Sequence, residues 1–218
     1  MSDTRSNASE IGSGPSVVEA LRRRRMIRSF DPAPLDPGRL DALLDLARRA
    51  PSAGNTQAVE FLVLDTPAAV AGYWDLTLPP PRRQMFRWQS LLDAPALVVV
   101  LTRPDAYVER YSEADKARAR LGESLDGWPV PFWWVDAGAV IENLLLLVTA
   151  AGLGACLFGL FEHEAAVLSA FGVPSEYRAA GTIAIGRPLD ERTGPSQDGR
   201  SARRGRPPIA DLIHRGRW

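Results

Sequence analysis

The segments Arg24-Arg25-Met26-Ile27-Arg28-Ser29-Phe30 and Pro51-Ser52-Ala53-Gly54-Asn55-Thr56-Gln57 lie on either side of one short amphipathic helix. The first brings several guanidinium groups close together, which suits a phosphate or an electron-rich carbonyl. The second is a polar turn of small hydrogen-bonding residues. The apolar run 59–64 follows it and has the composition of a strand. The two segments therefore predict a binding site for a phosphate-bearing ligand next to a sheet.

Composition excludes several classes of protein. The chain has 218 residues, of which 45% are apolar, so it can bury the core of one large domain. Its 26 basic and 26 acidic residues give a net charge of zero, which offers no global attraction to nucleic acid or to a membrane surface. A single cysteine, Cys156, rules out an internal disulfide and fits the cytoplasm. The separation of His163 and His214 predicts no metal site.

Two helix starts flank the arginine segment. Ser16-Val17-Val18-Glu19 has the pattern of a capping box. Asp36-Pro37 combines an N-cap side chain with proline at the first helical position, and predicts a helix that Pro51 ends. The apolar spacing in that helix predicts one buried face, made of Leu40, Leu43, Leu44 and Ala47, with Arg39, Asp45 and Arg48 facing outwards.

Further apolar runs predict the rest of the fold. The predicted strands cover residues 59–64, 97–101, 155–158 and 182–185, and the predicted helices cover 136–151 and 164–171. The strand at 97–101 is apolar throughout, as expected when both faces are buried. Because strands and helices do not alternate evenly, we expect an α+β fold rather than a doubly wound sheet.

The uncharged stretch 144–161 reaches the minimum length of a membrane helix. Gly152, Gly154 and Gly159 interrupt it, and glycine is unfavourable inside a helix. We therefore interpret the stretch as the end of a helix followed by a buried strand.

The two ends of the chain differ in composition from the middle. Residues 1–15 are rich in Ser, Asn and Gly, lack the pattern of a secretory signal and are predicted to be a flexible tail. Residues 16–193 form the predicted domain. Residues 194–218 form a C-terminal extension that begins with Gly, Ser, Pro and Arg. It ends in Ile209-Ala210-Asp211-Leu212-Ile213-His214 and Trp218, apolar residues that a partner subunit would bury.

Four blocks in this order resemble the FMN-dependent nitroreductase family. They are the arginine segment, the turn 51–57, the passage 150–156, and Ala184-Ile185-Gly186-Arg187-Pro188 with the later Arg203-Arg204-Gly205-Arg206-Pro207. The resemblance spans residues 16–218. It implies an α+β nitroreductase-like fold, with a central mixed or mostly antiparallel sheet flanked by helices and a C-terminal extension that crosses to the partner subunit of a homodimer.

The same resemblance implies an activity. Members bind two FMN molecules at the subunit interface and transfer electrons from NADH or NADPH to a nitroaromatic, a quinone or a similar small acceptor by a ping-pong mechanism. Arg28 matches a residue near the flavin carbonyl where negative charge grows on reduction, and therefore would tune the flavin. Gly159 lies where the backbone passes the reactive ring nitrogen, and no side chain is an obligatory acid or base.

The resemblance also implies a set of cofactor-binding residues. Arg24 matches a residue at the FMN phosphate, and Arg204 and Arg206 match the basic pair that closes over it. The turn residues would reach the flavin of the other subunit. The full set is Arg24, Arg25, Met26, Arg28, Pro51, Ser52, Ala53, Asn55, Arg87, Leu157, Phe158, Gly159, Arg204 and Arg206.

Two positions depart from the pattern of the family. Met26 stands where many members have a polar residue. Before Ala94-Pro95, members often have an amide and a lysine, whereas this chain has Gln84, Arg87 and Ser90. Arg87 is the expected substitute for the lysine.

The aromatic segment Gly127-Trp128-Pro129-Val130-Pro131-Phe132-Trp133-Trp134 has two interpretations. It is either a hydrophobic plug at a helix start or dimer interface, or a wall over the flavin. In the second case, Tyr107 and Tyr111 would complete a flat slot for an aromatic acceptor.

The function has alternatives as well. One is a specialised family member that modifies flavin, oxidises a heterocycle or removes halide. Another is a flavin-binding or storage protein without turnover, which a blocked aromatic lid would produce. NADH and NADPH both remain open as donors.

Overall fold

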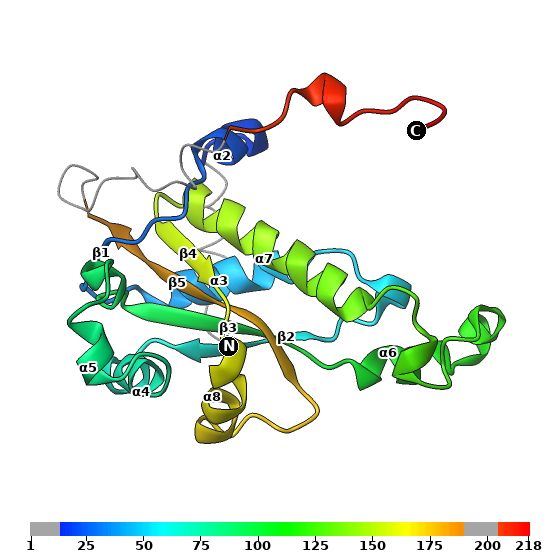
Figure 1. The fold of residues 1–218 in the computed structure, drawn as a ribbon, viewed down its shortest axis with the longest axis horizontal. Helices are drawn as coiled ribbons and strands as arrows, with labels where there is room; N and C mark the ends of the chain where they lie inside the picture. Colours follow the sequence, from blue (N-terminus) through cyan, green and yellow to red (C-terminus); the bar gives the residue numbers. More distant parts are fainter. Residues whose placement is uncertain (1–13, 190–204) are drawn as a thin grey trace.

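The computed structural model describes residues 14–189 and 205–218, in which helices cover both faces of a sheet (Figure 1). The strands are β1 (Phe30–Asp31), β2 (Val59–Leu64), β3 (Ala96–Thr102), β4 (Gly154–Phe158) and β5 (Arg178–Pro188). The helices are α2 (Val17–Arg23), α3 (Pro37–Ala47), α4 (Pro67–Thr77), α5 (Pro80–Arg83), α6 (Asp105–Tyr111), α7 (Phe132–Ala150) and α8 (Glu164–Ala170). The predicted α+β class is confirmed.

Strand β5 is the centre of the sheet. The order is β1-β5-β3-β2, and β4 also pairs with β5. These strand pairs are all antiparallel, with Val98 opposite Ile183 between β3 and β5, and Cys156 opposite Ala184 between β4 and β5. A register shift follows Val100 in β3. The sheet is therefore antiparallel, as the fold prediction allowed.

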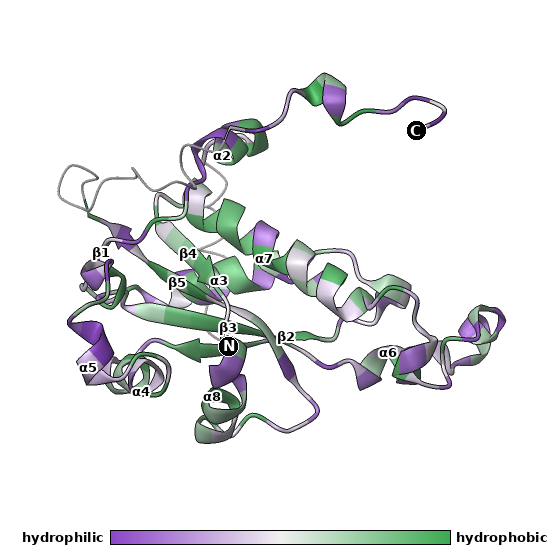
Figure 2. Cartoon of the chain, in the orientation of Figure 1, coloured by the Kyte–Doolittle hydropathy of each residue, from purple (hydrophilic) through white to green (hydrophobic). Residues whose placement is uncertain are grey.

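The strand β3 is buried along its whole length because each face of the sheet carries helices. Its residues Ala96, Val98 and Val100 pack in one core with residues of α3 and α7. The alternate residues Leu97, Val99 and Leu101 pack in the other core with residues of α4 and α8. The hydropathy colouring shows the same apolar strand between the layers (Figure 2).

Most predicted elements agree with the structure. The Ser16–Glu19 capping box and the Asp36 N-cap are present, and the four residues of the predicted α3 stripe are buried. The interpretation of residues 144–161 is also confirmed, because α7 ends at Ala150 and β4 follows at Gly154.

Three details of the prediction were wrong. Helix α3 ends at Ala47 rather than at Pro51, because the chain tightens into short turns over residues 48–50 before the proline. Arg39 does not simply face solvent, since its guanidinium donates to the carbonyl oxygen of Ala151 at the end of α7. Helix α7 begins at Phe132 instead of Asp136, because packing of its aromatic first turn overrides a modest helix propensity.

Gly186 occupies a place in β5 where a side chain has no room. A Cβ there would lie 2.7 Å from Pro95 Cδ and 3.0 Å from Phe30 Cδ1. We expect Gly186→Ala to lower the free energy of unfolding by about 1–3 kcal/mol, the usual cost of overpacking, as measured by urea denaturation. Gly72→Ala in α4 is the control, because its nearest neighbour, Phe171 Cζ, lies at an ordinary 3.8 Å. An equal loss in both variants would contradict the prediction.

Candidate functional site

The arginine segment lies along the outer edge of β4. The Ile27 N–H donates to the carbonyl oxygen of Ala155 at 2.8 Å, and Met26 forms a parallel bridge with the same residue. The Sδ of Met26 also accepts from the N–H of Leu157, at 3.5 Å. Met26 thus joins two of the blocks that the sequence singles out.

Arg24 and Arg25 have different partners. The side chain of Arg24 is 22% exposed, and its Nε lies 3.7 Å from a carboxylate oxygen of Glu142 on α7. So long a pair with a half-exposed carboxylate contributes little, which leaves the Arg24 guanidinium available to a stronger anion. Arg25 Nη1 instead donates to the carbonyl oxygens of Arg22 and Arg24, at 2.7 and 2.9 Å. It closes the end of α2.

Arg28 and Arg87 meet at one aromatic ring. The guanidinium carbon of Arg28 lies 5.2 Å from the ring centroid of Trp88, and that of Arg87 lies 5.6 Å from it. Arg28 Nη1 also donates to the carbonyl oxygen of Met26 at 3.1 Å. The structure therefore brings together Arg28, which is predicted to tune the flavin, and Arg87, which is expected to replace the lysine of other family members.

The end of β4 leaves a bare stretch of backbone at Gly159. A Cβ there would lie 2.9 Å from the ring of Phe161, which is 82% exposed and has a φ of +48°. The preceding residue, Phe158, is fixed from behind, because its ring stacks on Trp74 at 5.7 Å. Leu157 and Phe158 are both partly buried. The ring of Phe161 lies where a side chain at Gly159 would be, so a ligand at this backbone would contact Phe161 as well.

The polar turn is held from behind by a buried carboxylate. Asp136 on α7 is 5% exposed, and its Oδ2 accepts from the N–H of Ala53 at 2.9 Å and from the hydroxyl of Tyr107 at 2.7 Å. Burial, this hydrogen bond and the carboxylate charge raise the pKa of Tyr107 well above its usual range. Tyr107 therefore acts as a donor to Asp136.

The turn itself has an unusual backbone. Gly54, Asn55 and Gln57 have φ values of +62°, +59° and +54°. Arg110 on α6 donates from Nε to the carbonyl oxygen of Gly54 at 2.9 Å, and the N–H of Gln57 donates to Ser52 Oγ at 3.0 Å. Left-handed conformations outside glycine cost energy and persist where the surroundings impose them, often in binding loops.

The aromatic segment is divided between two surroundings. Trp128 is buried and packs against Tyr107 and Tyr111, with ring centroids 5.8 and 4.7 Å away, and its Nε1 donates to the carbonyl oxygen of Leu121. Tyr107 is fully buried, so the expected slot with Tyr107 as a wall is wrong. The hydrophobic-plug interpretation holds for Trp128, whereas Phe132 and Trp134 remain exposed.

The two groups of predicted contacts stay separate within one chain. The turn 51–57 bonds to α6 and to Asp136, whereas the arginine segment contacts β4 and Glu142. In the described parts of the chain, no hydrogen bond or salt bridge joins the two groups.

The described C-terminal residues 205–218 are exposed throughout. In Figure 1 this segment runs beyond α2, away from the sheet. It carries Arg206 and several exposed apolar side chains, of which Trp218 is 98% exposed. Arg204 and the beginning of the extension lie outside the described residues. The crossing of the extension to a partner stays a prediction.

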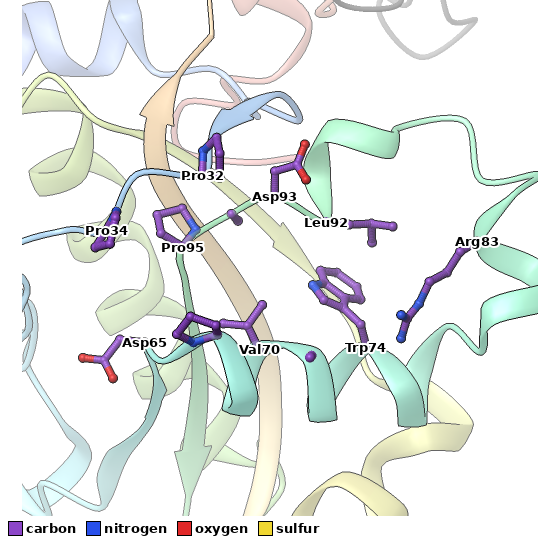
Figure 3. A pocket seen from close by; sticks show the side chains of 12 residues that line it. Pro32, Pro34, Asp65, Val70, Trp74, Arg83, Leu92, Asp93 and Pro95 are labelled. Carbon is purple, nitrogen blue, oxygen red and sulfur yellow. The ribbon is translucent and has the colours of Figure 1, made fainter.

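The cavities do not mark the predicted site. One of about 360 Å³ lies between α4 and the loops after β1 and before β3, and Figure 3 shows Trp74, Val70 and Pro95 around it. None of the predicted cofactor contacts lines it. A second, of about 290 Å³, includes Arg25 and Ile27 in its lining. A site completed by a second chain would not form a closed cavity in one chain.

Cys156 and helix α7 could each have a special role, but both are parts of the core. Cys156 is buried, and burial raises the pKa of its thiol while the charge of Arg28 opposes that rise, which fits a core residue better than a nucleophile. Helix α7 is long and apolar enough to cross a membrane, but its side chains Ala137, Leu144 and Val148 are fully buried in the fold. Among the described residues, no three His, Cys, Asp or Glu side chains gather as a metal site would require.

Comparison with known proteins identifies the family to which the chain belongs. The model of the nitroreductase family matches residues 21–187, which include the turn, the arginine segment and all of the sheet except its last residue, Pro188. The chain belongs to the nitroreductase family. It is therefore a member of a family of oxidoreductases, and the resemblance expected from the sequence is confirmed.

Relatives and solved structures agree with this assignment. A protein of Archaeoglobus fulgidus named as an NADH dehydrogenase/NAD(P)H nitroreductase is 26% identical over 92% of this chain and 98% of its own. An NADH dehydrogenase of Thermus thermophilus is 29% identical over 79% of this chain and 86% of its own. The structure of a nitroreductase in complex with FMN from Exiguobacterium sibiricum has a TM-score of 0.65 at 23% identity, covering 92% of this chain and 97% of that one. This last likeness shows the fold.

Sequence reasoning missed two residues that support the site. Asp136 was read as a helix start, and only its position in an otherwise apolar stretch signals a buried carboxylate. Trp88 was not singled out, although it directly follows Arg87. Its contact with Arg28 depends on a tertiary approach that no local pattern encodes.

Proposed function

We propose that this nitroreductase-family protein is a homodimeric flavoprotein that binds FMN non-covalently. It transfers electrons from NADH or NADPH to a nitroaromatic, a quinone or a similar small acceptor by a ping-pong mechanism, in the cytoplasm. The observation that carries the proposal is the docking of the arginine segment on β4, which puts Arg24 and Arg28 beside the strand that leads to Gly159.

The residues present fit FMN. Arg24 has a weak partner and can exchange it for the phosphate, for which a guanidinium fork is suited. Arg28 and Arg87 both lie against the indole of Trp88 and gather positive charge there. The flavin gains negative charge when it is reduced, and nearby positive charge stabilises that state. Gly159 lies at the strand end with the exposed ring of Phe161 against it, so a ligand there would contact both residues. From the partner chain, Pro51, Ser52, Ala53 and Asn55 would complete the site, as the resemblance to the family implies.

The remaining predicted contacts have smaller parts. Leu157 and Phe158 support the ring side through β4, Met26 and Arg25 shape the backbone of the arginine segment, and Arg204 and Arg206 cover the phosphate. When bound, FMN supplies the redox chemistry, since it accepts electrons from a nicotinamide and passes them on. The protein binds and orients the cofactor and places positive charge beside it. No side chain serves as an obligatory acid or base.

The acceptor side is proposed to be flat and apolar. Phe161 and Trp134 are exposed aromatic side chains, and neither is absorbed into the small core around Trp128. The storage alternative requires an aromatic lid that blocks the flavin. Tyr107 and Trp128 are buried in the small core and so do not contribute to such a lid, which supports our choice of turnover.

The proposal predicts a yellow protein whose FMN is released by heat. Reconstitution with FMN at about a hundred times its dissociation constant should raise the free energy of unfolding by roughly 2.7 kcal/mol. Absorption spectra before and after anaerobic addition of NADH or NADPH should show reduction, followed by reoxidation by a quinone. Riboflavin, which lacks the phosphate, is the control ligand and should bind more weakly. A chain that gives no flavin spectrum and no thermal shift would refute the proposed function.

A further inference from the structure

Trp88 is a rigid platform for two positive charges. The indole is partly buried and packs against the core on the α4 side of the sheet, with the ring of Phe86 edge-on at 5.8 Å. Its backbone carbonyl accepts from the N–H of Leu91 at 3.0 Å, at the start of a short turn. The ring is therefore fixed from behind, while its surface receives Arg28 and Arg87 at 5.2 and 5.6 Å.

In the part of the chain that the structure describes, no carboxylate pairs with either guanidinium group. Within residues 14–189 and 205–218, neither Arg28 nor Arg87 forms a salt bridge, whereas Arg48, Arg83, Arg103, Arg110 and Arg178 each do. Two like charges close together repel one another. The negative faces of an indole attract cations and offset part of that repulsion. The ring thus supplies the attraction that an acidic side chain would otherwise give, without cancelling the charge.

We propose that Trp88 is a positioning residue that holds Arg28 and Arg87 in place to favour reduced over oxidised FMN. The inference rests on the proposed function, because it requires FMN beside Arg28. A cation that touches the flavin where negative charge accumulates binds the reduced form more tightly than the oxidised form. An aspartate or glutamate in place of the indole would also attract the arginines but would cancel one of their two positive charges. The aromatic ring thus holds the two guanidinium groups in place without neutralising their charge.

The test measures the potential of bound FMN in Trp88→Leu and Trp88→Phe by anaerobic spectroelectrochemical titration. Leucine keeps apolar bulk against the core but offers no aromatic face, so the ratio of the affinities for reduced and oxidised FMN should fall about three- to tenfold, the range of one to two cation–π contacts. Phenylalanine keeps a face and should rescue most of the ratio. Thermal unfolding of each variant separates this effect from a loss of fold, since a merely structural role would lower the melting temperature without shifting the potential.

A second arm asks whether Trp88 acts through the arginines. In the double variant Arg28→Gln/Arg87→Gln, which already lacks both charges, adding Trp88→Leu should leave the ratio unchanged. Arg48→Gln is the charge-matched control, because Arg48 pairs with Asp45 on the outside of α3 and should not alter the potential. If the wild-type chain does not bind FMN, the proposed function fails and this inference fails with it. If it binds FMN and Trp88→Leu has the wild-type potential, or has its full effect without both arginines, the inference alone is overturned.

Discussion

Deletion of residues 205–218 is expected to weaken the dimer at least 100-fold and to release most of the FMN. The segment exposes Ile209, Leu212, Ile213 and Trp218, and no element within the described residues covers them. Burial of such a side chain against a partner contributes about 1.5–3 kcal/mol, so the loss of several exceeds the roughly 2.7 kcal/mol that a 100-fold change requires. Sedimentation velocity gives the dimer dissociation constant, and absorbance gives the flavin content per protomer.

The single substitution Arg206→Ala separates the two effects of the deletion. It removes the predicted phosphate contact but keeps the apolar residues, so it should lower FMN affinity by roughly tenfold while the dimer persists. A truncated chain that remains a fully loaded dimer would show that the extension serves as a linker only.

Asp136→Ala is expected to have the second large effect, on the turn rather than on the extension. It leaves the Ala53 N–H and the Tyr107 hydroxyl without their buried acceptor. Each unsatisfied donor costs about 1–3 kcal/mol, so the free energy of unfolding should fall by about 2–6 kcal/mol. A turn no longer held in its left-handed conformation should also bind FMN at least tenfold more weakly.

Asp136→Asn is the matched control. Its amide oxygen can still accept both hydrogen bonds, so it should retain most of the stability and affinity that alanine loses. Urea denaturation and fluorescence titration with FMN measure the two quantities. Wild-type FMN affinity in a folded Asp136→Ala protein would show that the turn does not depend on this carboxylate.

Much of the fold follows from local patterns in the sequence. The stripe in α3 and the apolar runs of β2 and β3 are encoded residue by residue, through spacing and composition. The start of α7 was missed, because its first turn consists of aromatic residues whose helical state depends on packing against Tyr107. Helix α4 was not assigned at all, although Thr66 caps it and Pro67 follows.

Some residues of the candidate site could likewise be predicted from the sequence, and others could not. Its charged and glycine positions could be proposed from the resemblance, since they stand in recognisable local motifs. The supporting residues could not, because Asp136 bonds to Ala53 across 83 positions and Trp88 contacts Arg28 from a distant part of the sequence. Such contacts are properties of the tertiary structure.

The place of β5 at the centre of the sheet has a consequence for how the chain is made. β5 is the last strand that the described residues form, and it therefore leaves the ribosome after the others, yet β1, β3 and β4 all pair with it. Until residue 188 has emerged, the apolar β3 can pair only with β2, and its other edge stays open. Contacts so distant in sequence form slowly, and an unpaired apolar edge invites aggregation. Nascent chains stopped before residue 178 should therefore depend on chaperones, and chains extended past 188 should not.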